Sequence, residues 1–281
     1  MKLISAAPWA LAAVLAASVG VAMAGAKPAA ATDPQLEAAI ASPQRSDADR
    51  QRDRYRHPLQ TLSFFGIRPD MTVVEVSPGA GWYTEILAPY LSKSGRYYAA
   101  ASAVSLPTAS DGAKKAVAAM TARFAADPAR YGTPVITEFQ PPLRVDIAPA
   151  ASADLVVSFR NVHNWIARDS ELSAFQAFYA ALKPGGTLGI VEHRGKPGET
   201  VDEMKKTGYV SEAYVKALAQ QVGFRFVASS PVNNNPKDTK DHPEGVWTLP
   251  PTLELGDQDR AKYQAIGESD RMTLKFIKPQ P

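Results

Sequence analysis

The sequence contains no cysteine, and this absence excludes several classes of site. Without a thiol the chain has no disulfide, no cysteine-ligated zinc and no cysteine nucleophile. Histidine is scarce as well, with four residues in 281, so we expect no metal centre. Neither sign of charge dominates, because 31 Lys and Arg stand against 28 Asp and Glu, a formal net charge of +3. This balance lacks the basic excess that is typical of nucleic-acid binding.

The longest uncharged run lies at the N-terminus. No charge occurs from Leu3 to Ala26, and Val21-Ala22-Met23-Ala24 has the alternating small residues that suit a signal peptidase. We interpret residues 1–24 as a signal peptide and expect an exported protein, in a bacterium a periplasmic one, with no stable membrane insertion after cleavage. An uncleaved anchor is the alternative, because a run of this length can span a bilayer, although alanine makes it weakly apolar.

The next two segments differ sharply in charge. Residues 25–43 are rich in Ala and Pro and predict a flexible linker with a short helix near 36–41. Gln44 to Arg56 then contains five Arg and three Asp, and the pairs Asp49–Asp53 and Arg50–Arg54 recur at helical spacing. This pattern predicts a solvated surface helix. The alternative is an arginine cluster that closes over an anionic ligand.

Apolar, strand-like runs alternate with helix-like runs along most of the remaining chain. We expect strands at 73–76, 96–101, 134–139, 154–158, 186–192, 224–228 and 272–277, and helices at 82–91, 110–126, 170–182 and 211–222. This alternation predicts an α/β fold with a doubly wound, mostly parallel sheet and helices on both faces, in one domain over 44–281. Residues 230–271 contain five prolines and break the alternation, so we expect a long loop or a lid there.

A glycine-containing loop follows the first expected strand. Val73-Val74-Glu75-Val76 leads into Ser77-Pro78-Gly79-Ala80-Gly81, and a helical pattern follows. In open α/β sheets, ligands bind beyond the carboxyl ends of the strands. Glycines there let the backbone approach a ligand, and Glu75 offers an acceptor to an ammonium or hydroxyl group. The spacing is neither a Walker loop nor a complete dinucleotide-binding motif, so it is weak evidence alone.

Several motifs in order are more specific than the loop alone. The loop, then Gly95 to Ala99, then Asp154 to Ser158, then Leu182 to Leu188, resembles the signature of class I S-adenosylmethionine-dependent methyltransferases. Within that superfamily, Phe159 to Trp165 is similar to a group of exported bacterial predicted methyltransferases. The resemblance implies a seven-stranded Rossmann-like sheet with an antiparallel last strand, and S-adenosylmethionine as cofactor. The cofactor-binding candidates are Glu75, Ser77, Pro78, Gly79, Ala80, Gly81, Tyr83, Ser102, Asp146 and Asn161.

The chain departs from the superfamily pattern at three places. Ser77 replaces the first glycine of the loop. The second strand ends in Ala99-Ala100-Ala101-Ser102, where an acidic residue usually accepts hydrogen bonds from both ribose hydroxyls. Losing such charge-assisted bonds costs about 1.5–3 kcal/mol, of which Ser102 recovers part. Asp146 is the match for the acidic residue near the adenine amino group, a few residues after Pro141 and Pro142.

The groups that act on a methyl acceptor are expected just after the fourth strand. Methyl transfer is an in-line displacement that depends mainly on alignment, and a base helps when the acceptor carries a proton. His163 is the best-placed base, with Asn161 as a ligand contact and Trp165 as an aromatic wall. Structural roles are the alternative for all three. His193 is an alternative base, and His242 lies in the expected loop or lid.

Three functions compete at this point. The first is a methyltransferase that acts on a small molecule or an envelope component. The second is a non-catalytic exported module that binds a small ligand on the same fold. Two points favour this hypothesis: the ribose carboxylate is missing, and the cofactor is made in the cytoplasm. The third is an NAD(P)-dependent oxidoreductase, which lacks the third glycine and a Tyr-x-x-x-Lys pair. The sequence does not indicate the oligomeric state.

Overall fold

The computed structural model describes residues 33–281, and the predicted signal peptide (1–24) lies outside the described residues. Asp33–Pro281 forms one compact unit. None of its helices combines the length and the apolar character that a membrane crossing requires.

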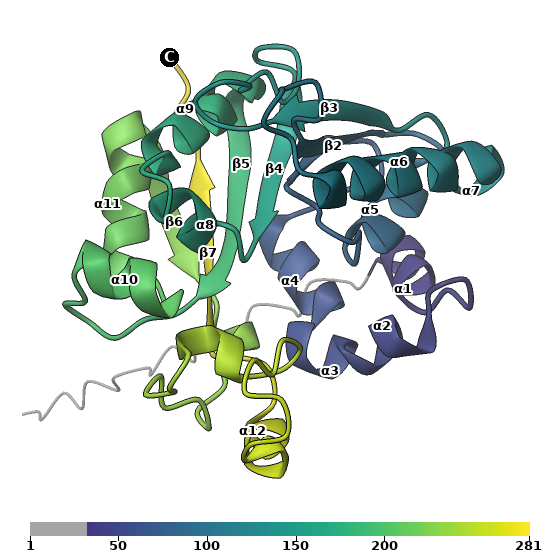
Figure 1. The fold of residues 1–281 in the computed structure, drawn as a ribbon. Helices are drawn as coiled ribbons and strands as arrows, with labels where there is room; N and C mark the ends of the chain where they lie inside the picture. The colour runs from purple at the N-terminus through teal and green to yellow at the C-terminus, as the bar shows by residue number, and fades with distance from the viewer. Residues whose placement is uncertain (1–32) are drawn as a thin grey trace, which may run out of the picture. The chain divides into compact units, whose positions relative to one another are not determined.

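One seven-stranded sheet forms the centre of this unit (Figure 1). Its strand order is β3-β2-β1-β4-β5-β7-β6. The strands are β1 (Thr72–Val76), β2 (Arg96–Ser102), β3 (Val135–Phe139), β4 (Ala153–Phe159), β5 (Leu182–His193), β6 (Arg225–Ser229) and β7 (Arg271–Ile277). The pairs among β1 to β5 are parallel, whereas β7 runs antiparallel to both β5 and β6. The structure therefore confirms the predicted fold class, including the antiparallel last strand.

Helices cover both faces of the sheet because strand residues alternate between the faces. Val73 packs with one buried cluster and its neighbour Val74 with the other. The first cluster includes residues of α1 (Pro34–Ile40), α4 (Pro58–Phe65), α5 (Thr84–Leu91), α6 (Asp111–Ala126) and α7 (Pro128–Tyr131). The second includes residues of α8 (Val162–Ile166), α9 (Glu171–Ala181), α10 (Val201–Thr207) and α11 (Glu212–Val222).

The N-terminal part of the described chain is packed on the domain. Leu36 of α1 is buried, and Asp33 accepts hydrogen bonds from the N–H groups of Gln35 and Leu36 at the start of that helix. Residues 33–43 therefore belong to the compact unit, although we expected them to lie in a linker. Residues 25–32 of that linker lie outside the described part.

The arginine-rich segment differs from the surface helix that its spacing predicts. It forms two short helices, α2 (Asp47–Gln51) and α3 (Asp53–Arg56). Arg45 and Arg56 are only 1% and 2% exposed. The prediction of one solvated helix was wrong, because the domain buries guanidinium groups on this side and supplies acceptors such as Asp53, which binds Arg45 through both carboxylate oxygens.

The expected loop or lid is anchored by buried polar side chains. Residues 230–271 contain the short 3₁₀ helices η1 (Pro231–Asn233) and η2 (Gly245–Thr248) and the helix α12 (Arg260–Ile266). Asn233 donates to the hydroxyls of Thr61 and Thr273, and Asp238 accepts from the Tyr209 hydroxyl. Because β7 begins opposite the end of β5, this segment lies at the carboxyl rim of the parallel strands (Figure 1).

Candidate active site

Two cavities meet at the glycine-containing loop after β1. The larger has a volume of about 300 Å³ and the smaller about 170 Å³. Ser77, Pro78, Gly79 and Asn161 line both of them. The loop is thus a shared wall at the carboxyl ends of β1 and β4, where an open α/β sheet is expected to bind ligands.

The two glycines of the loop have different roles. Gly79 has φ +59°, and a Cβ added to it would meet no atom within 4 Å, so the space beside its backbone is open. Gly81, also a predicted contact, has φ +91° and lines neither cavity; an added Cβ would lie 2.7 Å from Arg123 Nη1. Gly79 therefore exposes the backbone to a ligand, whereas Gly81 shapes the entry into α5.

Ser77 holds a backbone conformation that favours glycine. Its φ is +51°, in the left-handed region, and its N–H donates to the Ala100 carbonyl at 2.9 Å. This explains why the resemblance leads one to expect glycine at this position. The loop keeps its path with serine there, so the departure does not close the cavities.

The larger cavity lies over the ends of β2 and β3. Ala101 and Ser102 line it from β2, and Gln140 and Pro141 from the turn after β3. No Asp or Glu is among its lining residues within the described chain, so the missing ribose carboxylate has no replacement there. Asp146, the predicted adenine contact, is exposed and lies outside this lining.

Trp165 forms part of the wall of the larger cavity. It is 4% exposed and packs edge-on against Phe139, with 5.7 Å between ring centroids. The tryptophan therefore belongs to the core and to the cavity wall at once, so the two interpretations of this residue are compatible.

Glu75 and Tyr83 line the smaller cavity. Glu75 Oε2 accepts hydrogen bonds from Thr84 Oγ1 at 2.9 Å and from the Tyr97 hydroxyl at 2.6 Å. Burial raises the pKa of Glu75 to about 7, against the opposing effect of these two donors. The Tyr83 ring stacks on Phe159 at 3.5 Å, and burial raises the pKa of its hydroxyl to about 12.

Asn161 fastens the loop to the end of β4. Its Nδ2 donates to the carbonyls of Val76 at 3.2 Å, Ser77 at 3.3 Å and Phe159 at 3.3 Å. The side chain also lines both cavities. Asn161 is therefore placed both to position the loop and to contact a ligand.

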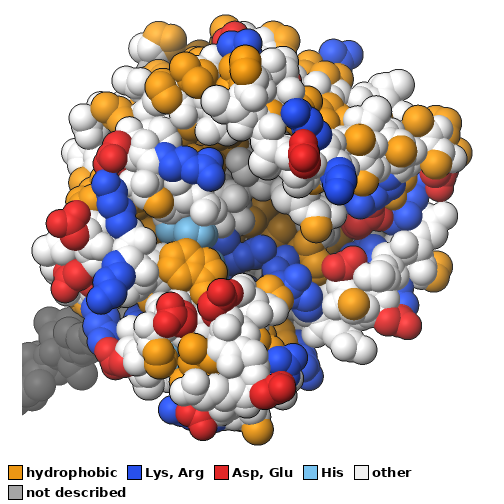
Figure 2. Space-filling view, viewed as in Figure 1, with side chains coloured by type: hydrophobic (Ala, Val, Ile, Leu, Met, Phe, Trp, Pro, Cys, Tyr) orange, Lys and Arg blue, Asp and Glu red, His pale blue; other side chains and the backbone are white. Residues whose placement is uncertain are grey.

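Three arginines, Arg52, Arg56 and Arg160, line the smaller cavity. Arg52 Nε and Arg56 Nε donate to Glu268 at 2.6 Å and 3.2 Å. Sequence reasoning offered an arginine cluster only as the alternative and missed Arg160. The signal for Arg160 was present, because it directly follows the buried run that became β4. Figure 2 shows this face of the molecule hollowed near its centre, with Lys or Arg side chains and a histidine in the hollow.

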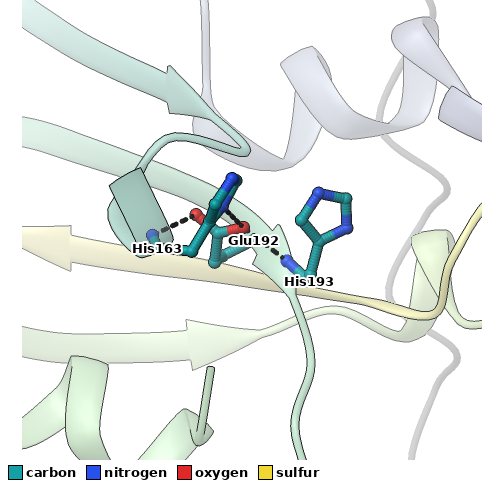
Figure 3. Close-up of side chains that lie close together, drawn as sticks. All are labelled: His163, Glu192 and His193. Carbon is teal, nitrogen blue, oxygen red and sulfur yellow. Dashed lines mark hydrogen bonds and ion pairs between the residues drawn. The ribbon is translucent and has the colours of Figure 1, made fainter. Parts of the chain in front are cut away.

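His163 is paired with Glu192, a residue that sequence reasoning did not select (Figure 3). Nδ1 of His163 lies 3.0 Å from Glu192 Oε1, and the N–H of Val162 donates to Oε2 at 2.5 Å. His163 is 7% exposed and borders neither of the two cavities. His163 therefore lies just behind the cavity walls, two residues after Asn161.

His193 lies beside this pair. Its ring centroid is 5.2 Å from that of His163, and its Nδ1 is 2.6 Å from Ser269 Oγ. Burial, and then the neighbouring His163, lower the pKa of His193 well below its usual value. The three side chains offer possible metal-ligand atoms within 4.8 Å of one another, but Glu192 already accepts hydrogen bonds from three backbone N–H groups and from His163. This arrangement is that of an oriented histidine.

His242 has a structural environment. Its Nε2 lies 2.9 Å from Asp238 Oδ1, which anchors the segment before β7. It lines neither cavity.

Comparisons with known proteins agree with the architecture. No protein-family model matches the chain, and no curated protein matches it. A solved S-adenosylmethionine-dependent methyltransferase from Aquifex aeolicus is similar, with 15% identity, a TM-score of 0.52 and coverage of 81% of this chain and 93% of that one. The fold is that of S-adenosylmethionine-dependent methyltransferases.

Two further structures show how far this likeness extends. Phosphoethanolamine N-methyltransferase 2 of Haemonchus contortus, solved with S-adenosylmethionine, has 17% identity and a TM-score of 0.51, over 80% of this chain and 53% of that one. The [4+2]-cyclase SpnF has 16% identity and a TM-score of 0.52, over 83% and 82%. Since a cyclase shares the fold, the fold does not by itself decide the reaction.

Proposed function

We propose that the chain is an S-adenosylmethionine-dependent methyltransferase, exported to the periplasm, that methylates a small molecule or an envelope component. The observation that carries this proposal is the wall formed by Ser77, Pro78 and Gly79 between two cavities. The two cavities adjoin at this loop, so an elongated cofactor can lie across it, with its methionine part toward Glu75 and its adenosyl part toward Ser102. An in-line displacement depends on holding the reacting groups in a fixed orientation, and a cofactor held at both ends meets that need.

The residues of the site fit the cofactor at one end better than at the other. Glu75 suits the ammonium group of its methionine part, because no hydrogen bond from the described residues reaches Oε1. The open backbone at Gly79 admits the ligand, and Ser102 and Gln140 offer hydrogen bonds in the larger cavity. When bound, the cofactor supplies an electrophilic methyl group. The absent ribose carboxylate predicts a lower affinity than the superfamily norm.

His163 is the proposed proton acceptor. If Nδ1 carries the hydrogen that it donates to Glu192, Nε2 keeps its lone pair and can accept a proton from an acceptor hydroxyl or amine. Glu192 is then a positioning residue, since it fixes the ring and its tautomer. Asn161 keeps the loop wall in place during the same step.

A non-catalytic ligand-binding module is the second candidate. The observation in its favour is the lack of Asp and Glu around the larger cavity within the described residues. Such a module would bind an adenosyl compound without transferring a methyl group.

Calorimetry of the purified protein separates these candidates. Titrations with S-adenosylhomocysteine and with NADH, combined with a methyl-release assay, give a different result for each function. A methyltransferase binds S-adenosylhomocysteine and releases methyl groups to an acceptor, whereas the module binds without release. Binding of NADH but not of S-adenosylhomocysteine would overturn the proposal.

A further inference from the structure

We propose that the smaller cavity is an anion-binding subsite, in which Arg160, together with Arg56, holds a carboxylate or phosphate group of a ligand. This inference rests on the proposed function for the identity of one ligand, but its evidence is the arrangement of charges around the cavity. The cavity is lined by the guanidinium-bearing residues Arg52 and Arg56 from the N-terminal helices and Arg160 from the end of β4.

The positive charges at this place exceed the negative ones. Arg271, at the start of β7, does not line the cavity but also contacts Glu268. Glu268 is the single acidic partner of Arg52, Arg56 and Arg271 among the described residues. The other carboxyl group on the wall, Glu75, has its pKa raised to about 7 by burial, so it compensates only part of the charge. Three of the four arginines thus pair with one strong anion, and Arg160 has no ion pair among the described residues.

Several guanidinium hydrogens lack acceptors. Nη1 of Arg56 and Nη2 of Arg52 are buried and have no hydrogen-bond partner among the described residues. The whole Arg56 side chain is 2% exposed. Buried N–H groups are rarely left unpaired, and unpaired buried charge is costly. A two-oxygen anion in the cavity would provide the missing acceptors in the geometry that guanidinium groups favour.

Arg160 is the residue whose side chain is most available. Its guanidinium group makes no hydrogen bond or ion pair with the described residues, although the side chain lines the cavity. Burial, and then the nearby Arg56 and Arg271, lower the pKa of Arg160 well below its usual value, because a buried and unpaired guanidinium charge is unfavourable there; a bound anion would compensate that charge.

The backbone at Arg160 is unusual as well. Its φ is +61°, a left-handed conformation that is unfavourable for arginine. The Arg160 N–H donates to the Val191 carbonyl at 2.7 Å and so fixes this turn to β5. Strained residues of this kind concentrate where a side chain must be presented to a ligand.

An aromatic ring further restrains the cluster. The guanidinium carbon of Arg56 lies 4.6 Å from the ring centroid of Trp82, which lines the same cavity. A guanidinium group held this way is already ordered, so less conformational entropy is lost when it pairs with an anion.

The anion can come from two sources with the same chemistry: the carboxylate of the cofactor's methionine part, or an anionic group on the acceptor. The test uses Arg160→Gln, because this side chain holds no described contact that folding would lose. Arg68→Gln is the matched control, since Arg68 is 60% exposed and paired with Asp70 on the surface. Thermal unfolding verifies that both variants fold. A third variant, Arg160→Lys, keeps the positive charge but lacks the paired N–H donors of a guanidinium group.

Three probes distinguish the sources by calorimetry. S-adenosylhomocysteine carries the carboxylate, 5′-methylthioadenosine lacks the amino-acid part, and inorganic phosphate represents an anionic acceptor. If the cofactor is the source, Arg160→Gln weakens S-adenosylhomocysteine binding tenfold or more and leaves 5′-methylthioadenosine unchanged. If the acceptor is the source, S-adenosylhomocysteine affinity is unchanged, and phosphate binding to the saturated protein falls tenfold or more. We expect Arg160→Lys to be intermediate and Arg68→Gln to behave as wild type.

The proposal is overturned if Arg160→Gln changes neither S-adenosylhomocysteine nor phosphate affinity by more than twofold, or if the wild-type protein binds no phosphate and prefers 5′-methylthioadenosine. Failure of the proposed function gives a different result. A wild-type protein that binds no adenosyl compound refutes the methyltransferase, while phosphate binding that depends on Arg160 still supports the anion subsite.

Discussion

Nδ1 of His163 lies 3.0 Å from Oε1 of Glu192, and the same carboxylate accepts hydrogen bonds from the backbone N–H groups of Val162 and His193. Glu192 is itself fully buried at the end of β5. The imidazole therefore has one fixed orientation, and Nε2 is the nitrogen left for a ligand. The same contact would also be made by a histidine that only stabilises the turn, so the two roles need a kinetic test.

We expect His163→Ala to lower the rate of methyl transfer by about 10²-fold or more while S-adenosylhomocysteine affinity stays nearly intact. The reason is that His163 lines neither cavity, so its loss leaves the cofactor contacts in place, whereas the proposed proton acceptor, Nε2, is removed. Single-turnover rates, measured with an acceptor found by the methyl-release assay, and calorimetry give the two quantities. If the variant unfolds or transfers at the wild-type rate, His163 is structural and His193 becomes the next candidate base.

Gly79→Val should abolish S-adenosylhomocysteine binding in a folded protein, because the side chain would occupy the space beside the loop backbone. Gly198→Val is a matched control, since Gly198 also has a positive φ, +82°, with no atom within 4 Å of an added Cβ, and lines neither cavity. Both variants should lose about 1–2 kcal/mol of stability from backbone strain. Equal S-adenosylhomocysteine affinities of the two variants would show that the ligand does not contact Gly79.

Glu75 should make ligand affinity depend on pH. Its pKa is raised to about 7 by burial, and the ammonium group of S-adenosylhomocysteine pairs with the ionised form. Affinity should therefore fall as the pH drops below about 7, by at most about tenfold per pH unit. Calorimetry over a range of about 3 pH units centred on pH 7 measures how the affinity for S-adenosylhomocysteine changes. Glu75→Gln should bind weakly with little dependence on pH, and a parallel slope in this variant would assign the titration to another group.

The same carboxyl group should affect stability in the opposite direction. The pKa of Glu75 in the folded protein, about 7, lies above the ordinary value of 4.5 for a glutamate, so the folded state holds the proton more tightly. The stability that Glu75 contributes is complete below pH 4.5 and is lost as the pH rises through about 7, by at most about 1.4 kcal/mol per unit. Denaturant unfolding should show that wild type loses stability relative to Glu75→Gln as the pH rises through that window. A constant difference in the free energy of unfolding between the two proteins would refute the prediction.

Restoring an acid at the end of β2 should strengthen cofactor binding. Ser102 is exposed, whereas Ala101 is 4% exposed, so Ser102→Asp adds a charge without burying it. We expect Ser102→Asp to tighten S-adenosylhomocysteine about tenfold through charge-assisted hydrogen bonds to the ribose, and Ala101→Asp to gain less. If neither variant gains affinity in calorimetry, the ribose does not lie over this strand.

The sequence was informative where local pattern and topology coincide. Val73 to Val76 and Leu155 to Ser158 are buried runs rich in valine, and their positions predicted the loop and Asn161 at one rim. The burial of Arg56 was not predicted, because the residues around it have the charge spacing of a surface helix. Its burial depends on the ion pair with Glu268, which is far away in the sequence. The Glu192 pairing depends on strand register in the same way, and periodicity carries no information about it.

The ion pairs of Glu268 join the beginning and the end of the described chain. Arg52 and Arg56 emerge early, but Glu268 and Arg271 follow only with β7, which inserts between β5 and β6. Until that strand is in place, the early arginines have no acidic partner to accompany them into the interior. The last strand therefore brings the acidic partner of these arginines with it, and we expect a chain cut before residue 268 to lose its ligand pocket together with that strand.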